Sequence, residues 1–412
     1  MLNALRYHLA LALAISLSAC GGGGSTGSSS ISSSSSGVTG SSSSSSSSGS
    51  SSSNGSSSSS SGSGATNYTL TELAPLSSGG TGTFVSAVND VGQAVGYTGY
   101  GDVDEPQIWD GATTTALQQC GLACVTTAIN SSGTIAGYGF GSAGAQAVTW
   151  TGISATTLTN PSMGPDQNAE AYAINDAGQV VGYINNEATG NNNATSWIAG
   201  APTALASNGA DVTVAQGINN TGQIVGYAGS NSSDTETAVV WHGTVMSELA
   251  SLGGPQTQAT AVNDAGQVVG WSNLPAISST TNQYISHATS WNGNAVTDLG
   301  TLGGSISQAL SIDASGQIVG NSTLATDPTS PSGATVTHAV IWNHGVIVDL
   351  NTELAAAVSV YVTLANATGI NDSGQIVANG TDSRIHNGNA QLTPMAFLLT
   401  PVVSSNASAA SK

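Results

Sequence analysis

From residue 67 onward, apolar and polar positions alternate in short runs that glycine-containing turns separate. One unit recurs: an apolar pair, an Asx residue, two further positions, a glycine, and then a second apolar run. An Asx side chain can hydrogen-bond the backbone two residues further on, and glycine supplies the positive φ of a tight turn. Each unit therefore predicts two antiparallel strands joined by a tight turn. The Asx residues of the seven units are Asn89, Asn130, Asn175, Asn219, Asn263, Asp313 and Asn371.

The period of this pattern predicts the fold class. Successive turn glycines lie 41 to 58 residues apart, close to the period of propeller blades. Between turns, the sequence predicts a third strand that ends in tryptophan and a short fourth strand, as at residues 295–299. We expect the tryptophans to pack between neighbouring sheets, because a large flat ring fills such space well. They are Trp109, Trp150, Trp197, Trp241, Trp291 and Trp342.

The two ends of the repeated region are complementary. After the seventh turn the chain supplies a third strand at residues 395–399 but no fourth strand. Before the first turn, residues 68–76 match the pattern of a fourth strand. We expect these two segments to pair, which predicts an all-β, seven-bladed β-propeller with four-stranded blades, closed by an N-terminal strand that completes the last blade. The competing architecture is an open solenoid, which would need capping repeats.

The first 19 residues are typical of a lipoprotein signal peptide. An apolar run at residues 9–17 is too short to span a bilayer. The sequence Leu17-Ser18-Ala19-Cys20 resembles the lipobox of bacterial lipoproteins, which implies cleavage before Cys20 and its lipidation. Gly21 resembles the default pattern for sorting to the outer membrane. The alternative is an ordinary signal peptide with an incidental cysteine.

Residues 20–66 are expected to form the lipidated cysteine and a disordered, Gly/Ser-rich tether. This segment has no aromatic residue before position 68, so it cannot bury enough apolar surface to fold. Its typical end-to-end reach is about 35–40 Å. The propeller is assigned to residues 67–402, and a disordered tail to residues 403–412.

The charge of the chain excludes several partners. Only three residues are Lys or Arg, 22 are Asp or Glu, and the formal net charge is −19. Nucleic-acid binding is excluded, because phosphate contacts need a basic surface. The same charge disfavours anionic lipid headgroups and acidic polysaccharides.

The repeats resemble the HAF family of probable extracellular repeats, named for a His-Ala-Phe tripeptide in the third strand. The tripeptide occurs as variants at His287-Ala288-Thr289, His338-Ala339-Val340 and Met395-Ala396-Phe397, and residues 298–304 read Asp-Leu-Gly-Thr-Leu-Gly-Gly. The resemblance covers residues 67 to about 402. It implies an exported, repeat-built β-protein and no established activity.

Two groups of side chains are candidates for binding. His287 and His338 occupy the same position in neighbouring repeats; they could bind a metal or titrate near neutral pH, but we expect each to bond a backbone carbonyl. Asp102, Asp104 and Glu105 form the densest acidic cluster, expected in the loop between the second and third strands of the first blade. Such oxygen ligands could hold Ca²⁺, and a solvated acidic loop is the alternative. No other cofactor is expected.

Cys120 and Cys124 are the only cysteines after the tether. In an exported protein such a pair predicts a disulfide rather than a redox site. It would close a very small loop between the first and second blades.

No catalytic motif accompanies these residues, and no catalytic residue is assigned. The sequence predicts a membrane-anchored, extracytoplasmic, monomeric module for binding, interaction or structural display. It would face the periplasm or the cell surface at the bacterial outer membrane. A neutral glycan or an envelope protein is the expected partner, besides the membrane lipid that holds the acylated N-terminus. The alternative is a propeller hydrolase that acts on a neutral glycan.

Overall fold

The computed structural model describes residues 67–402, except residues 102, 142–143, 161–166, 187–188, 278–283, 326–335 and 385–392. The chain divides into two compact units, Met1–Ala65 and Thr66–Lys412. All described residues belong to the second unit. The expected signal peptide, Cys20, the tether and the C-terminal tail lie outside the described residues.

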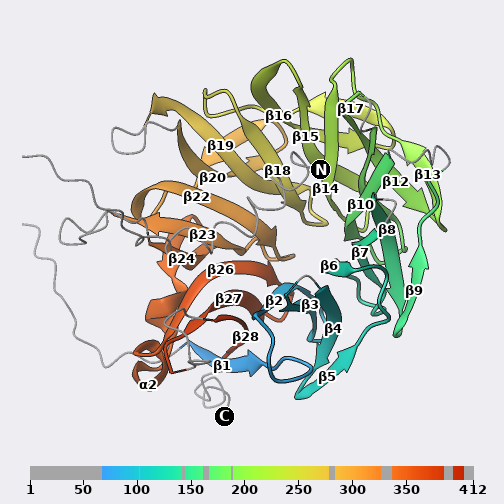
Figure 1. Ribbon diagram of the computed structural model, residues 1–412. Helices are drawn as coiled ribbons and strands as arrows, with labels where there is room; N and C mark the ends of the chain where they lie inside the picture. Colours follow the sequence, from blue (N-terminus) through green and yellow to red (C-terminus); the bar gives the residue numbers. More distant parts are fainter. Residues whose placement is uncertain are drawn as a thin grey trace, which may run out of the picture. The chain divides into compact units, whose positions relative to one another are not determined.

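The described part is all-β apart from two short helical turns, as the repeat pattern predicts. Its sheets are arranged around a common centre, with the first strand of each repeat innermost (Figure 1). One sheet has four strands, and three sheets have eight. In each eight-stranded sheet, two runs of four antiparallel strands are joined by one parallel residue pair.

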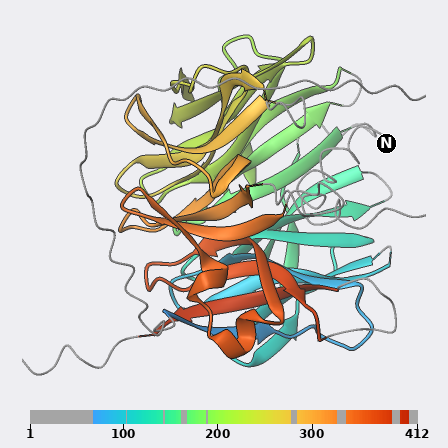
Figure 2. The same ribbon diagram turned by 90° about the vertical axis from the view of Figure 1, so that its left-hand side faces the viewer.

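The four-stranded sheet unites the two ends of the unit. Its order is β1 (Tyr68–Leu73), β28 (Pro394–Pro401), β27 (Ile376–Asp382) and β26 (Val362–Ile370). Strand β1 is antiparallel to β28, with Glu72 opposite Phe397 and Leu70 opposite Leu399. In the side view, the blue N-terminal strand lies among red C-terminal strands (Figure 2). The expected pairing of the terminal strands is thus confirmed, although β1 ends at Leu73 rather than at residue 76.

The other strands follow in chain order. The first eight-stranded sheet contains β2 (Gly82–Val88), β3 (Gln93–Tyr100), β4 (Val103–Asp110), β5 (Thr113–Ala116), β6 (Ala123–Ile129), β7 (Ile135–Gly141), β8 (Gly144–Thr151) and β9 (Ser154–Thr157). The second contains β10 (Gln167–Ile174), β11 (Val180–Asn186), β12 (Asn191–Ile198), β13 (Ala201–Ala204), β14 (Val212–Ile218), β15 (Gln223–Ser230), β16 (Ser233–His242) and β17 (Val245–Glu248). The third contains β18 (Thr257–Val262), β19 (Gln267–Ile277), β20 (Tyr284–Asn292), β21 (Ala295–Asp298), β22 (Gly303–Ile312), β23 (Ile318–Leu324), β24 (Thr337–Asn343) and β25 (Val346–Asp349).

The helical turns were not expected from the sequence. A 3-10 helix, η1 (Leu350–Glu353), and an α-helical turn, α2 (Ala356–Ser359), connect β25 to β26. Asp349 caps η1, because its carboxylate accepts a hydrogen bond from the Asn351 backbone. Among the described residues, no helix has the length and apolar character that a membrane-spanning segment needs.

Each Asx turn joins two antiparallel strands, as expected, but its hydrogen bonding differs in detail. In the first turn the Asn89 side-chain oxygen accepts from the backbone of Gln93, four residues on, at 2.9 Å. The same bond recurs in the other six turns. The expected bond two residues on is added at Asn219 and Asn371. Glycine at the fourth position has positive φ, for example 85° at Gly92.

The tryptophans pack between runs of strands, as predicted. The six predicted side chains are at most 2% exposed. Each indole Nε1 also donates to a carbonyl oxygen that follows the last strand of the preceding run; Trp150, for example, donates to Gln118 at 2.8 Å. The equivalent bond of Trp109 goes to Ala74, just after β1, at 2.7 Å. Each tryptophan therefore combines burial with a hydrogen bond across a junction.

Candidate functional site

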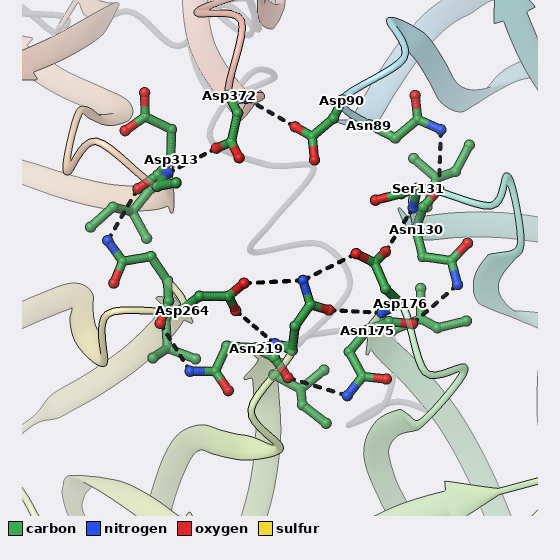
Figure 3. Close-up of a pocket in the computed structure, with 18 of the residues that line it drawn as sticks. Asn89, Asp90, Asn130, Ser131, Asn175, Asp176, Asn219, Asp264, Asp313 and Asp372 are labelled. Atoms are coloured by element: carbon green, nitrogen blue, oxygen red, sulfur yellow. Dashed lines mark hydrogen bonds between the residues drawn. The ribbon is translucent and has the colours of Figure 1, made fainter.

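The seven Asx turns meet around a polar pocket of about 240 Å³ (Figure 3). The first strand of every run ends at this pocket, so one turn from each repeat contributes to its wall. Five carboxylate-bearing residues line it: Asp90, Asp176, Asp264, Asp313 and Asp372. The pocket is therefore acidic, in keeping with the charge of the chain.

A ring of hydrogen bonds links one turn to the next. The Asn89 side-chain amide donates to the Asn130 carbonyl oxygen at 3.1 Å, and Asn130 donates in turn to Asn175 at 3.0 Å. The bond recurs at the next three steps. Asn371 then donates to Asn89 at 2.9 Å, across 282 residues of sequence. These bonds thus connect neighbouring turns around the pocket, including the last turn with the first.

One step of this ring differs from the other six. Asp313 occupies the asparagine position, and a carboxylate cannot donate to the Asn371 carbonyl. Its oxygens instead accept from Ser315 and from the Gln317 backbone. The step from Asp313 to Asn371 therefore lacks the donor that the other steps use.

A second layer of bonds uses the residue after each Asx. The backbone N–H of Ser131 donates to the Asp176 carboxylate at 2.9 Å, and that of Asp372 donates to Asp90 at 3.0 Å. Asn220 also donates its side-chain amide to both Asp176 and Asp264. Most of these carboxylates therefore accept hydrogen bonds from neighbouring turns. Within the described residues, no group of three or more His, Cys, Asp or Glu side chains is arranged to hold a metal ion.

The two candidate histidines have carboxylate partners, not the backbone carbonyls that we expected. His287 Nδ1 lies 2.9 Å from Asp298, and His338 Nδ1 lies 2.6 Å from Asp349. Strand register explains this, since each aspartate lies on the short fourth strand, diagonally opposite its histidine. Each histidine thus has its own partner within its own run of strands.

Burial and hydrogen bonds act in opposite directions on the pKa of Asp349 in the second pair. Burial alone would raise the pKa of Asp349. The bonds from His338 and from Asn351 outweigh it and hold the pKa of Asp349 below its ordinary value. This carboxylate therefore links β24, β25 and the start of η1.

The expected acidic loop of the first repeat is a strand. Asp104 and Glu105 belong to β4, which also contains Asp110, while Asp102 lies outside the described residues. Strand β4 begins one residue after Asp102. Its pairing with β3 holds the backbone of Asp104 and Glu105 in an extended conformation. Asp104 is partly buried, and this burial raises the pKa of its carboxyl group. Asp104 and Glu105 therefore lie in a paired strand and not in the loop that we expected, and Ca²⁺ binding stays a hypothesis.

Cys120 and Cys124 form a disulfide, with their Cα atoms 5.9 Å apart. Cys120 lies in the connection from β5 to β6, and Cys124 lies in β6 and is fully buried. The bridge therefore stabilises a connection between two runs of strands, as the cysteine spacing predicted.

A cluster that the sequence reasoning missed surrounds Glu170 on β10. Glu170 is 2% exposed and accepts a hydrogen bond from the Tyr172 hydroxyl at 2.8 Å. Tyr183 of β11 lies directly opposite Glu170 across the β10–β11 pair. Burial, followed by the negative charge of Glu170, raises the pKa of Tyr172 and that of Tyr183 well above the ordinary value. The repeat pattern held a signal for this cluster, because no other repeat has an acidic residue at the position of Glu170.

Comparison with known proteins gives fold neighbours only. No protein-family model and no curated protein matches the chain. Among solved structures, the β-propeller domain of the Trilobed protease from Pyrococcus furiosus matches with a TM-score of 0.42 and 9% identity, over 79% of this chain and 97% of that chain. XC5397 from Xanthomonas campestris, described as a gluconolactonase, matches with a TM-score of 0.38 and 9% identity, over 78% and 87%. Both likenesses are too distant to carry an argument about function.

Proposed function

We propose that this chain is a lipid-anchored, extracytoplasmic binding module whose folded part is a seven-bladed β-propeller. Each blade would comprise four strands, and β1 would complete the last blade. This proposal is supported by the seven Asx turns, each of which follows the innermost strand of a four-stranded run. Each eight-stranded sheet would then be two blades that share a single parallel residue pair, such as Asp104 with Ala123.

One observation supports the binding role: the turns at one end of the strands are alike in every run, whereas the connections at the other end differ. Because strands within a run are antiparallel, the Asx turns and the turns between the third and fourth strands lie at one end, and the other connections lie at the opposite end. The Asx turns keep the same length and the same internal bond in all seven copies. The opposite connections differ in length, from the two residues between β3 and β4 to the twelve between β23 and β24.

The end with the Asx turns is therefore a constant framework, and the opposite end is a variable surface. The hydrogen-bonded turns hold the strands rigidly, so loops at the other end can vary without loss of the fold. We propose that this variable end binds the partner, for which a neutral glycan or an envelope protein is the expected class. The resemblance to HAF repeats agrees with an exported repeat protein and stays a proposal, as does the outer-membrane location.

The anchor has a direct test. A Cys20→Ser chain should leave the membrane fraction of the cell, whereas the native chain should stay there after a carbonate wash. A Cys120→Ser chain is the matched control, because it also exchanges one cysteine for serine and should stay in the membrane. Retention of the Cys20→Ser protein in washed membranes would refute lipidation.

Binding is tested with the same protein on a glycan array and by crosslinking in cells. Exchange of the β11–β12 connection (residues 187–190) for Gly-Ser residues of equal length should weaken capture of the partner. An equal exchange in the Asx turn at residues 220–221 should leave binding intact at temperatures where that variant is folded. If both exchanges leave capture unchanged, the variable end does not bind.

A hydrolase that acts on a neutral glycan is the second candidate. The observation that favours it is Asp104, whose raised pKa suits a general acid. Asp104 also lies close enough to Tyr97 and Tyr138 for its charge to raise the pKa of both phenols, in each case after the effect of burial. If a hydrolytic activity is found, Asp104→Asn should abolish it, and unchanged turnover would remove this candidate.

A further inference from the structure

Exposed aliphatic side chains recur at the end of the strands that carries the Asx turns, here called the Asx end. The turns between the third and fourth strands place one such side chain there in the second, third, fourth and sixth runs. The first Asx turn and the residue after β28 add one each from the first and seventh runs. The exposed fractions are 67% at Val91, 58% at Ile153, 61% at Ile198, 67% at Val245, 63% at Val346 and 46% at Val402.

The repeat places these side chains at one level. Val245 and Val346 are each the first residue of a fourth strand, Ile153 directly precedes such a strand, and Ile198 pairs with the first residue of one. Because the runs are arranged around a common centre, equivalent turns lie at the same height along the axis through that centre (Figure 1). Single exposed aliphatic residues are ordinary on a protein surface, whereas a ring of them at one height is a distinct surface feature.

The opposite end has no comparable ring within the described residues. In the fifth run, the exposed side chains of Ile277 and Tyr284 pair with each other across β19 and β20. The described residues of the second, third and fourth strand runs contribute no large exposed apolar side chain at that end. The remaining ones are Val103, Leu122, Val336, Val360 and Tyr361. The ring is therefore specific to the Asx end.

The N-terminal segment joins the fold at this same end. Fourth strands begin at the Asx end, and β1 takes the place of the fourth strand in the last run. Tyr68 lies opposite Pro401, and the backbone N–H of Val402 donates to the Asn67 carbonyl oxygen at 2.9 Å. The chain that precedes Asn67 therefore enters beside the exposed Val402, so an anchor on that chain attaches to the Asx end.

We propose that the Asx end is a membrane-contact surface, whose aliphatic ring binds a bilayer of lipids without net charge. Apolar side chains gain free energy when they leave water for the boundary between headgroups and acyl chains. The aspartates of the central pocket and the net charge of −19 disfavour anionic headgroups at this surface. The variable end then faces away from the bilayer, where it is free to bind a partner.

The tether makes a weak affinity for lipid sufficient. A few aliphatic side chains bind a bilayer only weakly by themselves. A flexible linker that holds the surface near the bilayer raises its effective concentration, to about a millimolar for a short linker. The inference therefore rests on the proposed lipid anchor for its strength in the cell, whereas the affinity of the ring itself can be measured without the anchor.

The test places a fluorescent probe at either end of the full chain. Cys120 and Cys124 form a disulfide, and Cys20 is the proposed acylation site, so an introduced cysteine is the thiol left for labelling. The vesicles consist of phosphatidylcholine with a nitroxide quencher at the headgroup. They should quench a probe on Val245→Cys about threefold more than a probe on Ile277→Cys. Ile277 is 54% exposed at the variable end and is therefore the matched control.

Removal of the ring should abolish this difference. In the Val245→Cys chain, Ile153→Ser together with Val346→Ser should lower the quenching to the level of the control probe. Leu122→Ser together with Val360→Ser removes two exposed apolar side chains from the opposite end and should leave the quenching unchanged. Thermal unfolding near the native midpoint would verify that both double exchanges fold. Addition of phosphatidylglycerol to the vesicles should reduce the quenching, because it adds like charge.

A Cys20→Ser version of each labelled chain separates this surface from the anchor. At millimolar lipid it should show the same order of quenching with a smaller amplitude, even if the native chain is not acylated. Equal quenching at the two ends, no effect of the Ile153 and Val346 exchanges, or stronger quenching with phosphatidylglycerol would overturn the proposal. A Val245→Cys signal that responds to protein concentration and not to lipid would also overturn it, and would assign the ring to contact between two copies of the chain.

Discussion

The side-chain amide of Asn371 donates to the main-chain carbonyl oxygen of Asn89 at 2.9 Å, although 282 residues separate the two. The same bond links Asn89 to Asn130, only 41 residues away, at 3.1 Å. The last turn therefore contacts the first in the same way as neighbours in sequence contact each other. The seven turns therefore form one hydrogen-bonded ring, which is interrupted only at the step from Asp313 to Asn371.

Asp313 is the one position where the ring lacks a donor. Asp313→Asn should supply an amide to the Asn371 carbonyl and raise the free energy of unfolding by about 1 kcal/mol. Urea unfolding followed by tryptophan fluorescence measures this change. The converse substitution, Asn263→Asp, removes a donor and should lower stability by about 1–3 kcal/mol. If Asp313→Asn does not stabilise, its carboxylate has a role that the ring does not explain.

Removal of β1 should destabilise the whole unit. Deletion of residues 67–73 exposes the edge of β28 and removes Leu73, which is 3% exposed. We expect a midpoint of thermal unfolding at least 10 °C lower, together with concentration-dependent aggregation through the free edge. Deletion of seven residues from the Gly/Ser-rich segment, at 58–64, is the matched control. An unchanged midpoint for the first deletion would mean that the β1–β28 pairing contributes little.

Six of the seven runs have a glycine in the second strand that should tolerate no side chain, whereas the seventh run has Ala378 at this position. A Cβ on Gly270 would lie 2.0 Å from the Gln258 carbonyl oxygen. Gly270→Ala should therefore destabilise by about 3 kcal/mol or prevent folding. Gly293→Ala is the comparison, because no heavy atom lies within 4 Å and only its φ of +59° opposes the change; it should cost about 1 kcal/mol. Equal losses in chemical unfolding would contradict the steric explanation.

The His338–Asp349 pair should make stability depend on acid pH. The pKa of Asp349 is lowered in the folded state, so its contribution is present above its ordinary value of 3.8 and is lost as the pH falls through the folded value. His338→Gln should reduce stability by about 1 kcal/mol at pH 7, and the loss should shrink toward pH 3. Unfolding between pH 3 and pH 7 measures it, with His242→Gln on the exposed end of β16 as the control. A loss that is constant over this range would argue against the carboxylate.

Features that recur along the sequence could be predicted, and features that depend on strand register or on the spacing between runs could not. The turn at Asn89 and the burial of Trp150 follow from local pattern, and the pairing of β1 with β28 follows from counting strands. The partner of His287 required the register of β20 with β21, which periodicity alone does not fix. The bond from one Asx amide to the next turn required the spacing between runs. Glu170 could be recognised in the sequence only because no other repeat has an acidic residue at its position.

The pairing of β1 with β28 also fixes an order of events when the protein is made. Strand β1 is among the first folded segments to be synthesised, yet its partner at residues 394–401 is among the last. Until the final strand has emerged, β1 has no sheet to join. Chain synthesis must therefore be essentially complete before the unit can become stable, and a truncated product is expected to be recognised as unfolded and degraded rather than to accumulate.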